Sequence, residues 1–169
     1  MALGSLVLMR HAKSDYPPGV HDHERPLNGR GRRDAVTAGI WFDQNRDIWH
    51  GHQPKVFVST ARRAQETWER VSRSFMVTHK NEPSIYEAAT STLIDLVHQD
   101  IVEGFDVLVV GHNPGIEDLA LFLSQQQPSH SRSQLSAKYP TCAIAVLEIL
   151  DAHWSDSSAR VSSFIVPRA

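Results

Sequence analysis

Three short apolar segments run without interruption through this sequence, at 5–10, 55–59 and 106–111. None of them alternates between apolar and polar residues, which is typical of strands that are covered on both faces. A fourth apolar segment lies at 142–149, and we expect a last one at 160–167 to pair with it as a hairpin. Buried strands are therefore the feature that most constrains the fold.

Amphipathic helical patterns fill the intervals between these segments, with apolar residues recurring every three or four positions. They lie at 30–46, 61–74, 91–103 and 114–124. Gly104 is placed to cap the third helix, and Pro114 suits the first turn of the fourth. The polar stretch at 124–134 reads as a surface loop. Because strands alternate with helices, we expect an α/β fold of three layers, α/β/α. Its central sheet would be mostly parallel, with helices on both faces and an antiparallel C-terminal hairpin at one edge.

Composition limits the class of protein. With 169 residues, 41% of them hydrophobic, we expect a single domain over 1–169 with a sizeable core. The formal net charge of −2 gives no general attraction to nucleic acid or to an anionic membrane. No apolar run approaches the roughly 20 residues that cross a bilayer. The single cysteine, Cys142, lies in an apolar segment, and we expect a buried, inert thiol in a cytoplasmic protein.

Ten histidines raise the question of a metal site, but their spacing does not support one. The sequence contains neither an HExxH nor a CxxC motif, and the HDHE run at 21–24 lies in a loop flanked by proline and glycine. We therefore expect no metal ion and no other cofactor.

Each of the three uninterrupted segments ends in cationic or imidazole side chains. Arg10 and His11 close the first, Arg62 and Arg63 follow the second, and His112 closes the third. In an open parallel sheet, the carboxyl ends of the strands line one crevice in which ligands bind. If these strands are neighbours, the cationic side chains converge there and would repel one another unless an anion lay between them.

Phosphate is the anion that these side chains suit best. Arginine offers a planar fork of donors to phosphate oxygens, and the helix after residue 60 adds its positive end. A neutral histidine can attack phosphorus, and a neighbouring arginine keeps it neutral by lowering its pKa. Arginines can also neutralise a phosphoryl group without a metal. The alternative for each residue alone is a strand cap, a turn or an exposed helix position, and we expect one of Arg62 and Arg63 to be exposed.

The same residues resemble a known family. LVLMRHAKSD at 6–15 is similar to the R-H signature of the histidine phosphatase superfamily, the phosphoglycerate-mutase-like proteins. Further motifs of this superfamily, or of its small SixA-type phosphohistidine phosphatase branch, are matched in order by ERPLNGRGRRDA at 24–35, VSTARRAQET at 58–67, VVGHNPG at 109–115 and YPTCAIAVLEI at 139–149. The resemblance spans nearly the whole chain.

The resemblance implies a role for each matching residue. His11 would be the nucleophile that becomes phosphorylated, and Arg10 would bind the phosphate beside it. Arg63 stands directly before the alanine of its motif, so it, and not Arg62, would be the second phosphate-binding arginine. His112 would be the second phosphate-binding histidine.

Four other positions are less firmly placed by the resemblance. Ser14 and Arg25 would lie at or near the phosphate pocket, although Arg25 could instead pair with a surface carboxylate. Asp22 could reach the pocket from the same loop as Arg25, but we expect it on the surface. Glu87 is the best candidate by position for the acid that protonates the leaving group. Its alternative is an exposed residue near a helix start, and some small members of the family are thought to lack this acid.

The resemblance also bears on the substrate. The stretch at 68–105 is too short for the insertions that lid the pocket in phosphoglycerate mutases and acid phosphatases. An open site would suit a phosphorylated side chain of another protein, such as phosphohistidine, and would equally suit a small phosphate ester. The sequence therefore predicts a metal-independent phosphatase that acts through a covalent phosphohistidine at His11. The alternative is a non-catalytic module that binds a phosphorylated partner.

Overall fold

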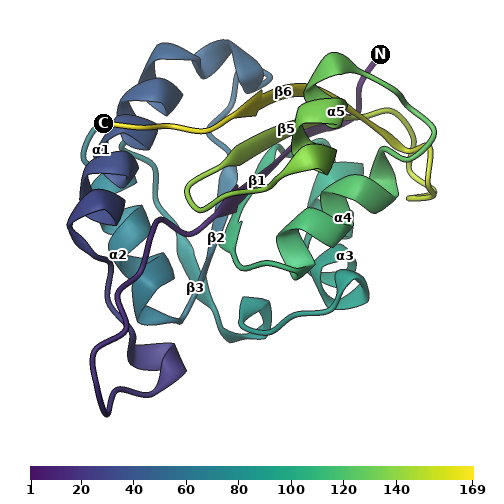
Figure 1. Cartoon of the computed structure of the whole chain (residues 1–169). Coiled ribbons are helices and arrows are strands. Elements are labelled where there is room, and N and C mark those ends of the chain that lie inside the picture. Colours follow the sequence, from purple (N-terminus) through teal and green to yellow (C-terminus); the bar gives the residue numbers. More distant parts are fainter.

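The computed structural model describes residues 1–169 and is organised around one six-stranded sheet (Figure 1). The strands are β1 (Gly4–Arg10), β2 (Lys55–Ser59), β3 (Lys80–Glu82), β4 (Val107–Gly111), β5 (Ile144–Ile149) and β6 (Ala159–Ile165). Their order across the sheet is β3-β2-β4-β1-β5-β6. The first four in this order are parallel, whereas β5 runs antiparallel to β1 and β6 antiparallel to β5. The predicted parallel sheet with an antiparallel C-terminal hairpin is confirmed.

Five α-helices cover the two faces of the sheet, which gives the expected three layers (Figure 1). On one face lie α1 (Gly29–Gln44) and α2 (Arg62–Val71), and on the other lie α3 (Thr90–Val102), α4 (Gly115–Leu123) and α5 (His130–Ala137). Short 3-10 helices are formed by Asp22–Glu24, Arg46–Ile48 and Pro83–Ile85. None of the helices combines the length and the apolarity that crossing a bilayer requires.

Strand β1 shows why its sequence is apolar without alternation. Leu6 and Leu8 lie in the core beneath α3, α4 and α5, while Val7 and Met9 lie in the core beneath α1 and α2. All four side chains are fully buried. Burying each of them is worth about 1.5–3 kcal/mol, so this central strand is held firmly on both faces. Its carboxyl end is therefore a rigid base for the residues that follow.

The polar stretch at 124–134 differs from the expected surface loop, because α5 begins within it. The Ser129 side chain accepts a hydrogen bond from the Arg132 backbone N–H at 3.0 Å and caps the helix. Leu135 is the only buried residue of α5. A helix with so little apolar sequence is stabilised by its cap and by packing against β6, and its local pattern gives no amphipathic signal.

The fourth apolar segment also differs from expectation, since β5 begins at Ile144 and not at 142. Cys142 lies in a turn with a left-handed backbone (φ 68°). Its N–H donates to the His11 carbonyl at 3.0 Å, so the turn ties this segment to the residue after β1. The thiol is buried as predicted, and burial raises its pKa to about 12. A thiolate, the reactive form of cysteine, is therefore scarce here near neutral pH.

Two smaller differences concern the segment between β2 and α3. Helix α2 ends at Val71, three residues before the predicted 74, and Lys80–Glu82 forms the edge strand β3, which the sequence did not reveal. β3 consists of three polar residues, so nothing in its composition marks it as a strand. Gly104 has φ 92° after α3, and the predicted cap at this position is confirmed.

Candidate active site

The register of the sheet brings the two histidines at strand ends together. Arg10 at the end of β1 pairs with Gly111 at the end of β4, so the next residues, His11 and His112, lie side by side. Their ring centroids are 5.1 Å apart. The His11 backbone N–H donates to the Gly111 carbonyl at 2.9 Å, which continues the ladder one step beyond the strands.

His11 is held as a neutral imidazole with one unprotonated nitrogen, Nε2. Its Nδ1 lies 2.7 Å from the Ala12 carbonyl, and because a carbonyl can only accept, Nδ1 carries the proton. Nε2 is then the basic nitrogen, and the Nε–H of Arg63 donates to it at 3.3 Å. Burial lowers the pKa of His11 to about 3, with further lowering by His112 and the nearby arginines. The ring therefore keeps a lone pair on Nε2 at neutral pH.

In His112, Nε2 is engaged by a hydroxyl group of the protein, and Nδ1 is the nitrogen left for a ligand. Ser59 Oγ accepts from the Ala61 N–H at 3.2 Å, and its own hydrogen has one acceptor within reach, His112 Nε2 at 2.7 Å, so the hydroxyl donates to Nε2. Nδ1 then carries the proton, and it is buried without a partner in the protein. Burial, and then the charge of Arg63, lowers the pKa of His112 to about 4. The ring is thus a neutral hydrogen-bond donor whose N–H has no acceptor in the protein.

Arg63 comes from the first turn of α2 and reaches the crevice between β1 and β4. Its side chain is 7% exposed, whereas that of the preceding Arg62 is 53% exposed and pairs with Glu66. The expectation that one of the two arginines would be exposed is confirmed. Arg63 also donates to Asp22, from Nη1 to the backbone carbonyl at 2.7 Å and from Nη2 to Oδ2 at 3.1 Å.

Comparison with known proteins assigns the family. The family model for the histidine phosphatase superfamily (branch 1) matches residues 6–106, more than half of the chain. The chain belongs to the histidine phosphatase superfamily. Two uncharacterised proteins, from Mycobacterium tuberculosis (strain ATCC 25618 / H37Rv) and Mycobacterium leprae (strain TN), are each 36% identical to it, and the matches cover 95% of this chain and 100% of each relative.

Solved structures place the chain near the SixA-type branch, as the sequence motifs predicted. A candidate phosphohistidine phosphatase SixA from Nakamurella multipartitia is 27% identical with a TM-score of 0.82, covering 98% of this chain and 97% of that one. A second candidate SixA, from Agrobacterium tumefaciens, is 26% identical with a TM-score of 0.78, covering 97% and 99%. The protein histidine phosphatase SixA complexed with tungstate shares the fold at 20% identity and a TM-score of 0.77, with coverage of 96% and 97%.

Arg10 is the last residue of β1 in this histidine phosphatase family member and directly precedes His11. Its Nη1 donates to the Tyr139 carbonyl at 2.9 Å, while Nε is buried and has no partner. Burial lowers the pKa of this guanidinium, and Arg63 adds to the lowering. Arg10 thus keeps a buried donor unused in the protein, as His112 does.

A carboxylate that we expected on the surface instead contacts this site. Asp22 Oδ2 accepts from Arg63 and also from the Tyr86 hydroxyl at 2.5 Å, although its side chain is 55% exposed. The hydrogen bond from Tyr86, and then the charge of Arg63, lowers the pKa of Asp22 to about 2. The expectation for Asp22 was therefore wrong in part, because its tertiary partners lie 41 and 64 positions away in the chain.

Arg25 and Ser14 lie one step further from the histidines. The Arg25 guanidinium donates from Nε to Asp22 Oδ1 at 3.0 Å and from Nη1 to Ser14 Oγ at 3.1 Å. It also stacks over the Tyr16 ring at 3.9 Å. Arg25 thus pairs with a half-exposed carboxylate, as one of its two alternatives proposed, and that carboxylate contacts Arg63. No hydrogen bond joins Ser14 or Arg25 directly to His11.

A cavity of about 420 Å³ opens beside these side chains, and Glu87 is on its wall. The other lining residues come from the loop before α1, from α2, from the approach to α3 and from the start of α4: Asp22, Arg63, Tyr86, Ala88, Ala89, His112, Asn113, Pro114 and Gly115. Glu87 is exposed and has a left-handed backbone (φ 57°). Its carboxylate is directed by no hydrogen bond, so the structure places it at the cavity without fixing it there.

Two residues at the site, Ser59 and Tyr86, were not named by sequence reasoning as site residues, whereas Asp22 was named but expected on the surface. Ser59 belongs to the VSTARRAQET motif at the end of β2. Its contact with His112 could have been inferred only if the register of the neighbouring strands β2 and β4 were known, because both strands end at the same place in the sheet. Tyr86 lies in the same segment as Glu87, but no local pattern connects it to Asp22. No group of three or more histidine, cysteine or acidic side chains is arranged to hold a metal ion.

Proposed function

We propose that this chain is a metal-independent phosphatase in which His11 becomes phosphorylated. The observation that carries the proposal is the state of Nε2. This nitrogen holds its lone pair because Nδ1 is committed to the Ala12 carbonyl and because burial lowers the pKa of the ring to about 3. A neutral imidazole nitrogen beside a guanidinium is what attack on a phosphoryl group requires.

The reaction would take two displacements at phosphorus. In the first, the Nε2 lone pair forms a P–N bond while the bond from phosphorus to the leaving group breaks, and the leaving group keeps that electron pair and takes up a proton. In the second, water attacks the phosphohistidine and gives up a proton that replaces the one taken by the leaving group, while the P–N bond breaks and Nε2 regains its lone pair. Inorganic phosphate and the neutral imidazole are the products.

The remaining charged groups would neutralise the phosphoryl oxygens. Arg63 already lies beside Nε2, so its guanidinium is in place to meet a phosphate that reaches His11. The unpartnered Nε–H of Arg10 and the unpartnered Nδ1–H of His112 supply two further donors. A buried donor without a partner costs free energy in the empty protein, and a bound phosphate would remove that cost. Ser14 and Arg25 would act indirectly, by holding Asp22 and the loop that carries it.

Glu87 is our proposed proton donor for ester leaving groups. Its position on the cavity wall favours it over Asp22, whose pKa of about 2 leaves it ionised and unable to donate near neutral pH. A phosphohistidine substrate would need less help, because its imidazole ring can take up a proton on the other nitrogen and then leaves as a neutral ring.

We propose a phosphorylated protein side chain, with phosphohistidine foremost, or a small phosphate ester as substrate. The likeness to SixA-type structures supports the first. We also propose that residues 1–169 form a single domain whose cavity works without a lid, because only short elements separate β2 from α3. A cytoplasmic location is proposed from the lone, buried Cys142, which needs no oxidising compartment.

The test compares wild type with His11→Ala in the presence of a chelator. Phosphate release is measured from p-nitrophenyl phosphate and from a phosphohistidine-bearing protein, and a radiolabelled phosphoenzyme is trapped at alkaline pH. We expect turnover and an acid-labile label in the wild type and neither in the variant. Full activity of His11→Ala would refute the proposal. Tight phosphate binding without turnover of either substrate would favour the non-catalytic binding module.

A further inference from the structure

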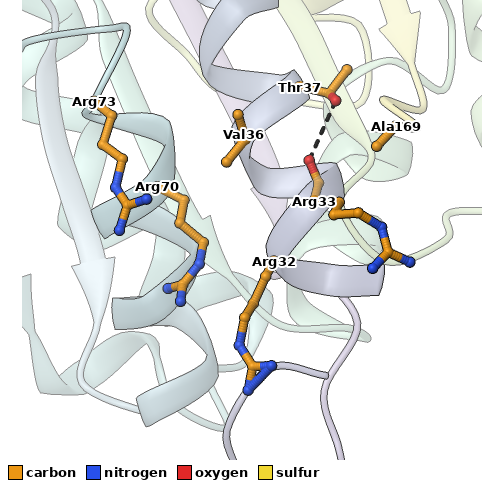
Figure 2. Close-up of a pocket in the computed structure, with 7 residues that line it drawn as sticks. All are labelled: Arg32, Arg33, Val36, Thr37, Arg70, Arg73 and Ala169. Atoms are coloured by element: carbon orange, nitrogen blue, oxygen red, sulfur yellow. Dashed lines mark hydrogen bonds between the residues drawn. The ribbon is translucent and has the colours of Figure 1, made fainter. Parts of the chain in front are cut away.

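A second cleft lies between α1 and α2 and shares no lining residue with the cavity beside His112. It has a volume of about 450 Å³. Four of its seven lining residues are arginines: Arg32 and Arg33 on α1, Arg70 on α2 and Arg73 just beyond it (Figure 2). We call these four residues the arginine cleft. Figure 2 shows the Arg70 side chain extending from α2 toward α1, and the Arg32 side chain extending from the start of α1 on the side that faces α2.

The arginine cleft carries a surplus of positive charge. Glu69 pairs with both arginines on the α2 side, at 3.0 Å from Arg73 and 3.6 Å from Arg70. No ion pair of the chain includes Arg32 or Arg33, and no acidic side chain lines the cleft. At a formal net charge of −2, the chain as a whole carries no such surplus. The positive field is therefore local.

The packing of the two helices does not depend on these arginines. A side chain at Gly39 would place its Cβ 2.5 Å from the Val71 carbonyl oxygen, so α1 and α2 meet there without an intervening side chain. Ala35 and Trp68 are buried in the core beneath the same two helices. Arg32, Arg33 and Arg73 are exposed outside this contact, whereas the Arg70 side chain is mostly buried and donates to the Glu66 carbonyl at 2.9 Å. Exposed like charges contribute little to stability unless an anion binds.

The chemistry of the lining indicates the kind of anion. Small-molecule pockets are mostly apolar and enclose their ligand, whereas here only Val36 and Ala169 are apolar. Arginine is enriched in protein interfaces, and its planar fork binds carboxylates with two parallel hydrogen bonds. Nucleic acid would need a longer basic track in order to follow successive phosphates. A short acidic peptide segment matches both the charge and the extent of the cleft.

We propose that the arginine cleft is a docking site for an acidic segment of a partner protein. This inference does not depend on the proposed function. If the partner is also the phosphorylated substrate, the two sites are well placed relative to each other. Arg63 and Arg70 lie seven residues apart on α2, which is about 10.5 Å along the helix axis. A docked segment could then hold a phosphorylated side chain near His11.

The experiment measures binding of a fluorescent decaglutamate peptide to the full chain by anisotropy, at low and at raised salt. The test variant is Arg32→Gln/Arg33→Gln, because both side chains are exposed and neither forms an ion pair. Glutamine keeps the helical propensity of α1. The control variant is Lys80→Gln/Arg160→Gln, which removes the same charge from the two outer strands, β3 and β6.

We expect the wild type to bind the peptide, with an affinity that falls as salt rises. The test variant should bind about tenfold or more weakly, and the control should stay within about twofold of wild type. Equal weakening in both variants would show a general charge effect and overturn the proposal. So would the absence of binding at low salt, or tighter binding of a decathymidylate that depends on the same two arginines. None of these readouts requires turnover, so they stand apart from the test of His11.

Discussion

The Nε–H of Arg63 donates to Nε2 of His11 at 3.3 Å, and both side chains are buried. A protonated imidazole would face this guanidinium with a like charge, so the contact itself favours the neutral ring. It also joins the end of β1 to the first turn of α2, since His11 and Arg63 are 52 positions apart in the sequence. In the proposed reaction, the same contact would place a cation beside the attacking nitrogen.

Replacing Arg63 by lysine should lower kcat/KM for p-nitrophenyl phosphate by about a hundredfold. Lysine keeps the charge but cannot reproduce the three donors that contact His11 and Asp22. The matched control is Arg62→Lys, which alters the exposed neighbour that pairs with Glu66, and it should stay within about twofold of wild type. Equal losses in the two variants would contradict the role of Arg63.

Removing the carboxylate of Asp22 should lower kcat while leaving the free energy of unfolding nearly unchanged. Asp22→Ala leaves Nη2 of Arg63 and the Tyr86 hydroxyl without their shared acceptor, so the guanidinium loses its orientation. A misplacement of this kind costs about ten- to a hundredfold in rate. Asp43→Ala removes a comparable surface pair, with Arg46, and serves as the control in the same phosphatase assay and in urea unfolding. An Asp22→Ala enzyme with wild-type kcat would show that Arg63 needs no such anchor.

Glu87→Gln should distinguish substrates by their leaving groups. Hydrolysis of a phosphoserine peptide, whose alkoxide leaving group needs a proton, should slow by about a hundredfold. Hydrolysis of p-nitrophenyl phosphate should change by less than about twofold, because nitrophenolate leaves without protonation. Steady-state kcat on both substrates makes the comparison. Equal effects on the two would remove Glu87 as the proton donor.

The free energy of unfolding should fall as the pH is lowered from 7 to 5. Burial lowers the folded-state pKa of His11 to about 3 and of His112 to about 4, from an ordinary value of 6.5. Between these values the unfolded chain binds protons that the folded chain does not, so acid favours unfolding and stability is recovered as pH rises toward 7. Each histidine should contribute about 2 kcal/mol to the loss at pH 5.

Urea unfolding of His112→Gln at the two pH values checks this expectation. The variant should lose about 2 kcal/mol less than wild type between pH 7 and pH 5. His153→Gln, which alters an exposed histidine, should lose as much as wild type. A pH dependence that is the same in all three proteins would mean that His112 is not held neutral by burial.

The architecture could be predicted because its signals are local. Uninterrupted apolar runs such as 5–10 predict strands buried on both faces, and the amphipathic stripes between them predict covering helices. The elements that escaped prediction carry little apolar sequence: β3 has none, and α5 buries only Leu135. Their stability comes from neighbours that are distant in the chain, and no window of sequence contains those neighbours.

The sequence by itself determined which side chains follow the strand ends, and its motifs indicated Arg63 as the arginine after β2. Only the tertiary structure decided that β1, β4 and β2 are neighbours, so that these side chains meet, and that Asp22 holds Arg63. The physical reason is that a continuous apolar pattern marks a strand locally, whereas strand order and the position of Asp22 depend on hydrogen bonds between separate elements. Such hydrogen bonds depend on the conformation of the loops that carry the partners, and a loop conformation has no periodic sequence pattern from which it could be predicted.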